Sequence, residues 1–337
     1  MSRYSVRLAS QRGVALILVL WIIMVLSLLI SGFAFTMHVE TQVAGFSRKE
    51  LKAEMLARSG IEVARMQLLL HDKSPTDVGF DALNQEWVTN QELYVDHELG
   101  EGKFNVVVTD EERKLPVNNL TAVQWHKLLD LLGMDPLDAD VIADSSLDWI
   151  DQNDLHRLNG ADNSYYANLV PAYRKKSGPL DRIEEMLLVR GVTQELFDGV
   201  PAGRKDAPGH PGLKDMLTTF STGQINVNTA STEVLQALLN INEAQATAVM
   251  QHRDGQDGAP GTDDDLPFHS AEEFLRTLSS DAKITQQYRP FVTVSSQFFH
   301  VKSTGEVAGA KYTIDTVLRR QGGTCLIASW RERRGGQ

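Results

Sequence analysis

One stretch of the chain constrains its fold more than any other. Residues 14–35 carry no charged side chain, and nearly all of them are apolar. At about 1.5 Å rise per residue, a helix of this length measures roughly 33 Å, which is enough to cross the hydrocarbon core of a bilayer. The sequence therefore predicts a membrane-spanning helix over residues 14–36.

The short segment before this helix predicts its orientation. Its only charged residues are Arg3, Arg7 and Arg12. Positive charge on a short flanking segment holds that side of a membrane helix in the cytoplasm. We therefore expect a single-pass protein of the inner membrane, in contact with its lipid, with the bulk of the chain in the periplasm.

The residue at the boundary of the helix indicates how the leader is processed. A secretory signal has a short apolar core followed by a small-residue cleavage site, whereas here the small residue, Gly13, comes before a long intact core. This arrangement resembles the leader of type IV pilins and type II secretion pseudopilins. The resemblance implies that a prepilin peptidase cuts after Gly13 and methylates the new N-terminus, Val14. The alternative is a plain signal anchor.

The fifth position after this cleavage site is Leu18. Most pilin-like proteins carry a glutamate there, which is thought to pair with the terminal amine of a neighbouring subunit. An unpaired carboxylate in lipid costs a few kcal/mol, and a leucine needs no partner. The resemblance therefore implies a place at the filament tip, as in minor pseudopilin K, the pseudopilin type that characteristically lacks this glutamate.

Composition limits the number of domains and the kinds of partner that the rest of the chain can have. The protein has 337 residues and a formal net charge of −11, so about 300 residues are left for two or three domains beyond the membrane helix. The acidic balance argues against nucleic acid as a partner, because phosphate binding needs basic patches. Cys325 is the only cysteine and cannot form an intramolecular disulfide.

Hydrophobic periodicity predicts an α+β fold. Helical spacing continues from the membrane span to residue 70, with Ala57, Ile61, Ala64 and Leu68 on one face. Alternating runs rich in β-branched residues predict strands at 103–109, 290–294, 298–305, 311–319 and 324–330, with turns at 305–309 and 321–323. We expect a pilin-like long N-terminal helix packed on an antiparallel sheet.

Between the first strand and the others, residues 111–288 show mostly helical patterning. This stretch is too long for a loop, so it predicts a large all-α domain inserted between strands. Segments 115–122 and 224–230 each precede a helix ending in Leu-Leu, and segments 183–187 and 271–275 each carry a Glu-Glu pair. These pairs predict two related helical subdomains.

The predicted organisation has five parts. They are a cleaved cytoplasmic leader at 1–13, a transmembrane helix at 14–36, a periplasmic helix with the first part of the pilin-like domain at 37–110, the inserted domain at 111–288 (subdomains about 111–219 and 220–288), and C-terminal strands at 289–337.

Two long segments carry a specific resemblance. Residues 147–192, LDWIDQNDLHRLNGADNSYYANLVPAYRKKSGPLDRIEEMLLVRGV, and the run GQINVNTASTEVLQALL from Gly223 resemble the general secretion pathway protein K family. The resemblance implies a minor pseudopilin that binds minor pseudopilins I and J and sits at the tip of the major pseudopilin filament. There it would contact secreted substrates or the outer-membrane secretin.

Two acidic segments are candidate calcium sites. Asp148, Asp151, Asp154 and Asp162 crowd one segment, and a second runs from Asp254 to Asp263 and Asp265. Calcium takes six to eight oxygen ligands, although neither segment follows the EF-hand pattern and both also suit solvated loops. The family resemblance implies calcium in the helical domain, so we expect a structural calcium at these carboxylates.

Other functions remain as alternatives. We find no catalytic motif, and we expect no enzyme. Residues 225–253 resemble a helix-hairpin-helix unit of anchored DNA-binding proteins, but the hairpin residues 240–242 lack glycine and the surroundings are acidic. A minor pilin or competence pseudopilin of a type IV pilus-like system would share the leader, whereas the long helical insertion argues against it.

Overall fold

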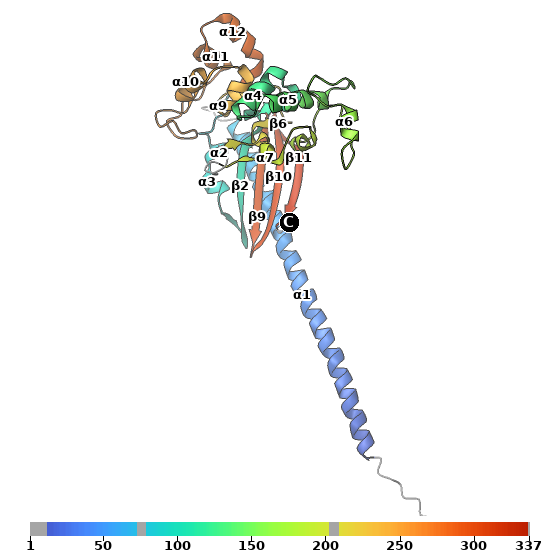
Figure 1. Ribbon diagram of the computed structural model, residues 1–337. Coiled ribbons are helices and arrows are strands. Elements are labelled where there is room, and N and C mark those ends of the chain that lie inside the picture. Colours follow the sequence, from blue (N-terminus) through green and yellow to red (C-terminus); the bar gives the residue numbers. More distant parts are fainter. Residues whose placement is uncertain (1–11, 73–78, 202–208, 336–337) are drawn as a thin grey trace, which may run out of the picture.

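A single helix dominates the molecule. The computed structural model describes residues 12–72, 79–201 and 209–335, and its first helix, α1 (Arg12–His71), runs unbroken for 60 residues. The N-terminal half of α1 stands clear of all other elements, while its C-terminal half lies against the sheet (Figure 1). The predicted long helix is confirmed. The leader arginines Arg3 and Arg7 lie outside the described residues.

The sheet is five-stranded and antiparallel, with the order β1-β2-β9-β10-β11. Its strands are β1 (His97–Leu99), β2 (Gly102–Asp110), β9 (Phe298–Val307), β10 (Ala310–Gln321) and β11 (Thr324–Arg334). The short helices α2 (Glu86–Thr89) and α3 (Gln91–Tyr94) precede β1. The α+β class is confirmed: β2 pairs with β9, although 187 residues separate the end of β2 from the start of β9 (298 − 110 − 1).

Small residues let α1 approach the sheet closely. Ala53, Ala57 and Ala64 are fully buried on the face of α1 that meets the sheet, together with the predicted Ile61 and Leu68. A Cβ atom at Gly305 of β9 would lie 2.0 Å from the carbonyl oxygen of Ala53, so that position admits only glycine without a shift of the backbone. The helix therefore packs backbone against backbone at this point.

Two details of the strand prediction were wrong. The run 290–294 does not join the sheet: a 3-10 helix covers Arg289–Phe291, and β8 (Val292–Thr293) pairs in parallel with β7 (Ile225–Asn226) in the helical part. The predicted turn at Gly305 is also displaced, because β9 continues to Val307 and the turn is formed by Ala308 and Gly309, both with positive φ. Short apolar runs carry no information about their pairing partner.

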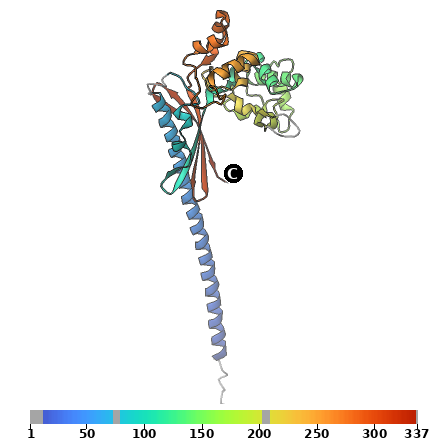
Figure 2. The ribbon, with the colours of Figure 1, turned by 90° about the vertical axis from the view of Figure 1, so that its left-hand side faces the viewer.

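The chain between β2 and β9 forms a helical part at the end of the sheet that is remote from the free half of α1 (Figures 1 and 2). Its helices of eight residues or more are α4 (Ala122–Leu131), α5 (Pro136–Ile150), α9 (Thr232–Leu239), α10 (Glu243–Arg253) and α11 (Ala271–Leu278). Shorter helices are α6 (Asn163–Ala167), α7 (Gln194–Asp198), α8 (Leu213–Met216) and α12 (Ala282–Tyr288), with 3-10 turns at Glu111–Arg113, Val117–Asn119 and Ile183–Leu188. Two-residue strands, β3 (Leu115–Pro116), β4 (Gly199–Val200), β5 (His210–Pro211) and β6 (Leu217–Thr218), link these helices.

The two segments that the sequence pairs as repeats make the same contacts. The Asn118 side chain bonds to both the N–H and the C=O of Leu180, at 2.7 and 3.0 Å. The Asn228 side chain bonds in the same way to Phe268, at 2.8 and 2.9 Å. Each repeat begins with a short strand that pairs in parallel with one at its end, β3 with β6 and β7 with β8. In each repeat, the asparagine three residues after the start of the first strand therefore holds the beginning of the repeat against its later segment.

The close contact between α1 and β9 generates a prediction. We expect Gly305→Ala to lower the free energy of unfolding by about 1–3 kcal/mol, because the added methyl group meets helix backbone that cannot rotate away. The measurement is chemical denaturation of the full chain in detergent. The same change at Gly45, where nothing lies within 4 Å, serves as the control and should not destabilise the chain. Equal stability of the two variants would contradict the close packing.

Candidate functional site

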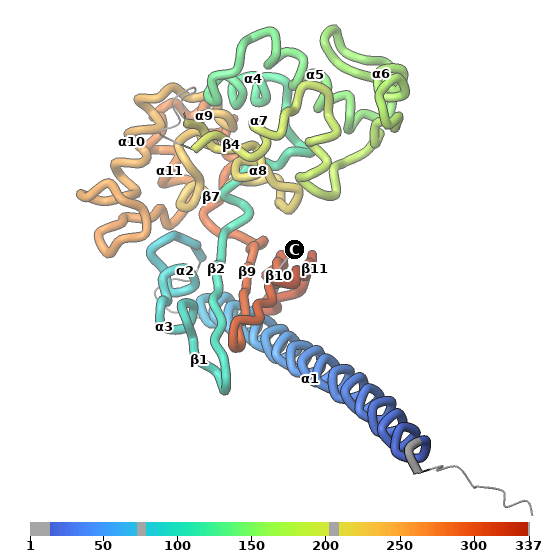
Figure 3. The backbone as a smooth tube through the Cα atoms, turned by 60° about the horizontal axis from the view of Figure 1, so that its bottom comes forward, coloured from blue at the N-terminus to red at the C-terminus, as the bar shows by residue number. Residues whose placement is uncertain are grey.

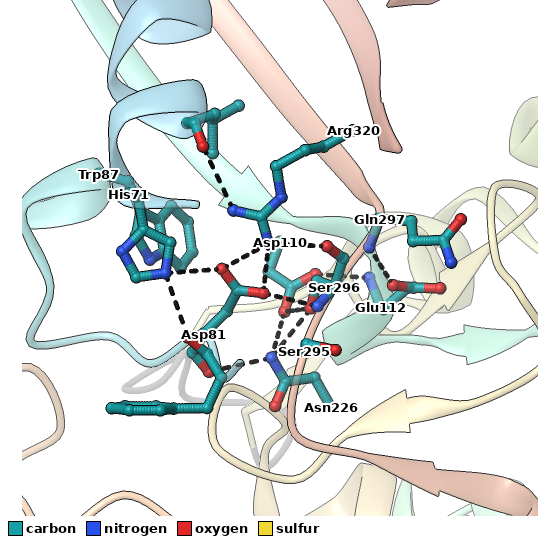
Figure 4. Close-up of polar contacts among 12 residues, drawn as sticks. His71, Asp81, Trp87, Asp110, Glu112, Asn226, Ser295, Ser296, Gln297 and Arg320 are labelled. Atoms are coloured by element: carbon teal, nitrogen blue, oxygen red, sulfur yellow. Dashed lines mark hydrogen bonds and ion pairs between the residues drawn. The ribbon is translucent and has the colours of Figure 1, made fainter. Parts of the chain in front are cut away.

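A buried polar network joins the sheet, the end of α1 and the helical part (Figure 4). Its centre is the carboxylate of Asp81, which is fully buried. Arg320 on β10 donates through Nη2 to both carboxylate oxygens of Asp81, at 2.7 and 2.6 Å. His71 lies 3.1 Å from the same carboxylate, and the N–H of Ser296 donates to it at 2.6 Å. The end of α1, the segment that follows it, the residues just before β9 and the end of β10 therefore meet at one charged group.

The partners of Asp81 control its charge. Burial by itself raises the pKa of this carboxyl, but the bonds from His71 and Arg320 outweigh burial and hold its pKa below the usual value. Arg320 has further acceptors in the carbonyl oxygens of Ser296, at 3.0 Å, and Leu68, at 3.4 Å. A buried ion pair is tolerated when such additional bonds satisfy both partners.

A second buried carboxyl, Asp110, ties the end of β2 to the helical part. One of its oxygens accepts bonds from Ser296 Oγ and Thr229 Oγ1, both at 2.6 Å, and from Asn226 Nδ2 at 3.2 Å. Burial raises the pKa of Asp110 to about 7, although these hydrogen bonds act in the opposite direction. Asn226 belongs to β7 of the second repeat, so the bond crosses from the sheet to the helical part.

The neighbouring Glu112 adds further hydrogen bonds between the end of β2 and these segments. Its side chain accepts two bonds from Thr222, through N at 2.9 Å and Oγ1 at 2.5 Å, and one from the N–H of Gln297 at 2.5 Å. We name the set Asp81, Asp110, Glu112, Asn226, Ser296 and Arg320 the joint. Because its groups bond to one another across three parts of the molecule, the arrangement holds the helical part in one orientation on the sheet.

Sequence reasoning did not identify the joint. Its members are spread from Asp81 to Arg320, and none stands in a recognisable motif. The available signal was Arg320 itself, a charged residue at the end of a strand whose alternate positions are mostly apolar. The sequence does not show how the strands pair, so it does not reveal that Asp81 is the partner of Arg320.

The free half of α1 presents apolar side chains on all sides. Every residue from Val14 to Phe35 is exposed, and the predicted processing site, Gly13 and Val14, lies in helical backbone at its start. Among the described residues, α1 contains the one segment long and apolar enough to cross a membrane. Leu18 is 57% exposed, so its side chain needs lipid or a neighbouring helix to cover it.

Two pairs of exposed apolar side chains lie along the C-terminal half of α1, with the exposed Glu62 between them on the same face, and we name the four residues the apolar stripe. It consists of Leu51, Met55, Met66 and Leu70, all between 45% and 56% exposed. Spacings of four, eleven and four residues place these side chains on one face of the helix. Leu51 and Met55 line a groove of about 420 Å³ together with Leu99 and Val307, and Met66 and Leu70 line a second groove of about 330 Å³.

The first acidic cluster is not gathered around a common point. Asp148 is buried and bound by Arg157, through Nη1 at 2.5 Å and the backbone N–H at 2.9 Å. Asp154 accepts from the Asn163 side chain at 2.9 Å. Asp151 and Asp162 accept backbone N–H groups two residues ahead of themselves, at 3.0 and 2.9 Å. The four carboxylates are therefore each engaged with a different partner.

The second acidic loop is likewise bonded to itself. Asp254 pairs with Arg253 at 2.6 Å, and Asp265 accepts the N–H of Gly261 at 2.7 Å. Asp263 is exposed. In the described part of the chain, no three acidic, histidine or cysteine side chains are placed to hold one metal ion. The carboxylates of neither acidic segment converge on one point in this arrangement, and calcium binding at both segments stays a prediction.

Comparison with known proteins gives a consistent family assignment. Family models described as "Type II secretion system (T2SS), protein K" match residues 102–201 and 225–294. The chain is 25% identical to type II secretion system protein K of Klebsiella pneumoniae over 93% of its own length and 94% of that protein. It is also 25% identical to the protein of the same name from Pseudomonas aeruginosa, over 92% and 89%.

A solved structure supports the fold. The match is a chain in the crystal structure of the GspK-GspI-GspJ complex from the enterotoxigenic Escherichia coli type 2 secretion system. The TM-score is 0.65 at 20% sequence identity, and the match covers 85% of this chain and 98% of that one. At this identity the likeness concerns the fold.

The buried Asp110 predicts a pH dependence of stability. The free energy of unfolding should fall, by on the order of a few kcal/mol, as the pH rises from about 4 to about 7. In that window native Asp110 keeps a proton that the unfolded chain has released. Chemical denaturation of the full chain in detergent at several pH values should show a flatter curve for Asp110→Asn. Asp263→Asn removes an exposed carboxylate and should leave the wild-type curve; a wild-type curve for Asp110→Asn would contradict this assignment.

Proposed function

The chain belongs to the type II secretion system protein K family and is a minor pseudopilin, and from that premise we propose that it caps the tip of the periplasmic pseudopilus and so supports protein secretion across the outer membrane. The observation that carries the proposal is α1, one unbroken helix that joins an exposed apolar span to a packed domain. Such a helix anchors the subunit in the inner membrane first and enters the filament core afterwards.

Two features of the chain support a place at the tip. Leu18 stands where other pilin-like proteins have a carboxylate that pairs with the terminal amine of a preceding subunit. Because leucine is uncharged, this helix does not require a preceding subunit to neutralise it. The helical part lies at the end of the sheet remote from the free half of α1. If the filament grows from the membrane, this bulk leads it, and the helical part is the surface that would meet secreted substrates or the outer-membrane secretin.

The apolar stripe on α1 supports the choice of partners. The similar solved chain is in a complex with GspI and GspJ, and we propose that minor pseudopilins I and J of this system dock here through their own long helices. Leu51, Met55, Met66 and Leu70 offer helical spacing on one face, and the major pseudopilin filament follows below. Each Å² of apolar surface that is buried contributes about 25 cal/mol of stabilisation, which favours helix packing along this face.

The proposal predicts how the native protein begins. Protein purified from its own membrane should lack residues 1–13 and start at a methylated Val14, because a prepilin peptidase cuts after the small residue before the helix. Intact mass and N-terminal sequencing measure this directly. Gly13→Leu should retain the full leader, since a bulky residue replaces the small one. A native chain that keeps Met1, or begins near Ala34, would contradict pseudopilin processing.

The stripe predicts a loss of assembly without a loss of folding. Wild-type protein should co-purify with pseudopilins I and J, and antibodies against the helical part should label pseudopili at one end only. The double change Met55→Glu and Met66→Glu should abolish both results, because two charges are placed on the helix-packing face.

Val123→Glu is the matched control for that variant. Val123 is an apolar residue on α4 that is 60% exposed, more than either methionine, and its replacement should leave co-purification unchanged. Normal co-purification of the stripe variant, or label along the whole filament, would contradict the proposed docking face or the tip position respectively.

A further inference from the structure

The ammonium group of Lys175 is surrounded by backbone oxygen atoms. Its Nζ donates to the carbonyl oxygens of Asp148, at 3.2 Å, of Asp151, at 3.0 Å, and of Asn153. An ammonium has three N–H donors and no acceptor, so these three contacts use its full capacity. Lys175 is only 5% exposed, which is rare for a lysine and requires such compensation.

The location of this group explains the need for a positive charge. Asp148 lies in the last turn of α5, and Asp151 is the residue that caps it. The last carbonyl groups of a helix have no partner within the helix and carry its negative dipole end. Helix α5 has no basic residue in its own last turn. Lys175 supplies the charge from 24 to 27 positions away along the chain.

The segment that carries Lys175 is held against the same helix end. The backbone N–H of Lys175 donates to Asn163 Oδ1 at 3.1 Å, and the N–H of Ser177 donates to the carbonyl oxygen of Trp149 at 3.0 Å. The segment thus satisfies consecutive carbonyls of α5 through both side chain and backbone. In Figure 3 the chain between α5 and α6 forms the outer edge of the helical part.

We infer that Lys175 is the built-in cation of the acidic loop after α5, residues 148–163, and that this loop holds its structure without a divalent metal ion. Carboxylate and backbone carbonyl oxygens are the ligands that a hard cation takes from such a loop. The ammonium already occupies the carbonyl oxygens of Asp148, Asp151 and Asn153, and a divalent ion at this point would face its positive charge. Arg157 neutralises Asp148 on the other side, so two cations of the chain organise the loop.

Hydrogen exchange of the full chain in detergent, read by mass spectrometry, tests the inference. After dialysis against EDTA, peptides that cover residues 148–163 should exchange at the same rate with and without added calcium chloride. Lys175→Met keeps the aliphatic stem and removes the charge, and it should speed exchange in these peptides by about tenfold or more under both conditions. Peptides covering 254–265 report the second acidic loop separately.

Lys176→Met provides the matched control. Its ammonium is bound by Asp181 and Glu185 on the surface, so its loss should leave exchange at 148–163 unchanged. Faster exchange of the wild-type loop in EDTA, reversed by calcium, would overturn the inference. So would unchanged exchange in Lys175→Met. If that variant does not fold, the wild-type comparison with and without calcium still decides.

Discussion

The ion pair between Asp81 and Arg320 is the interaction on which the arrangement of the molecule depends. It joins the segment after α1 to strand β10, and His71 and the backbone N–H of Ser296 also contact the Asp81 carboxylate. A pair this deeply buried is costly unless its geometry is fixed. Here the fixed geometry is useful, because the helical part is an insertion whose entry and exit strands, β2 and β9, are neighbours in the sheet. Asp110 and Glu112 extend the same bonding into that insertion, so the bulk at one end of the protein is coupled rigidly to the helix at the other.

Basic side chains of the same chain neutralise several of its buried carboxylates. Arg320 forms an ion pair with Asp81, and Arg157 forms one with Asp148. Lys175 donates to carbonyl oxygens at the end of the helix that carries Asp148. With a single cysteine, no disulfide assists. The polar links that orient the helical part are hydrogen bonds and ion pairs between distant segments of one chain, and Phe80, Val292 and Val294 add apolar packing to them. The helix α1 is attached differently, through close packing of alanine and glycine, and it leaves Leu51, Met55, Met66 and Leu70 exposed for neighbours.

Much of the fold was predictable because it is local. The apolar run from Val14 and the face formed by Ala57, Ile61, Ala64 and Leu68 required one long helix, and alternation of residues located the four long strands. The repeat was visible through Asn118 and Asn228, whose equivalent bonds to Leu180 and Phe268 explain why both segments look alike. The run 290–294 was misassigned because its alternation fits any sheet, and only the position of β7 decided where it pairs. The acidic segments showed the same limitation: their carboxylates are near in sequence, but each one turns to a different partner.

The amino-acid sequence by itself determined the membrane helix, its basic leader, the candidate cleavage site before Val14 and the class of protein, because these depend on composition and spacing along one segment. Only the tertiary structure decided that Asp81 meets Arg320, that Asp110 meets Asn226, and that the Lys175 ammonium meets the carbonyl oxygens at the end of α5. Each of these contacts joins residues between 22 and 239 positions apart. The pairing of buried charges follows from which backbone segments the core brings together, and no local pattern encodes that.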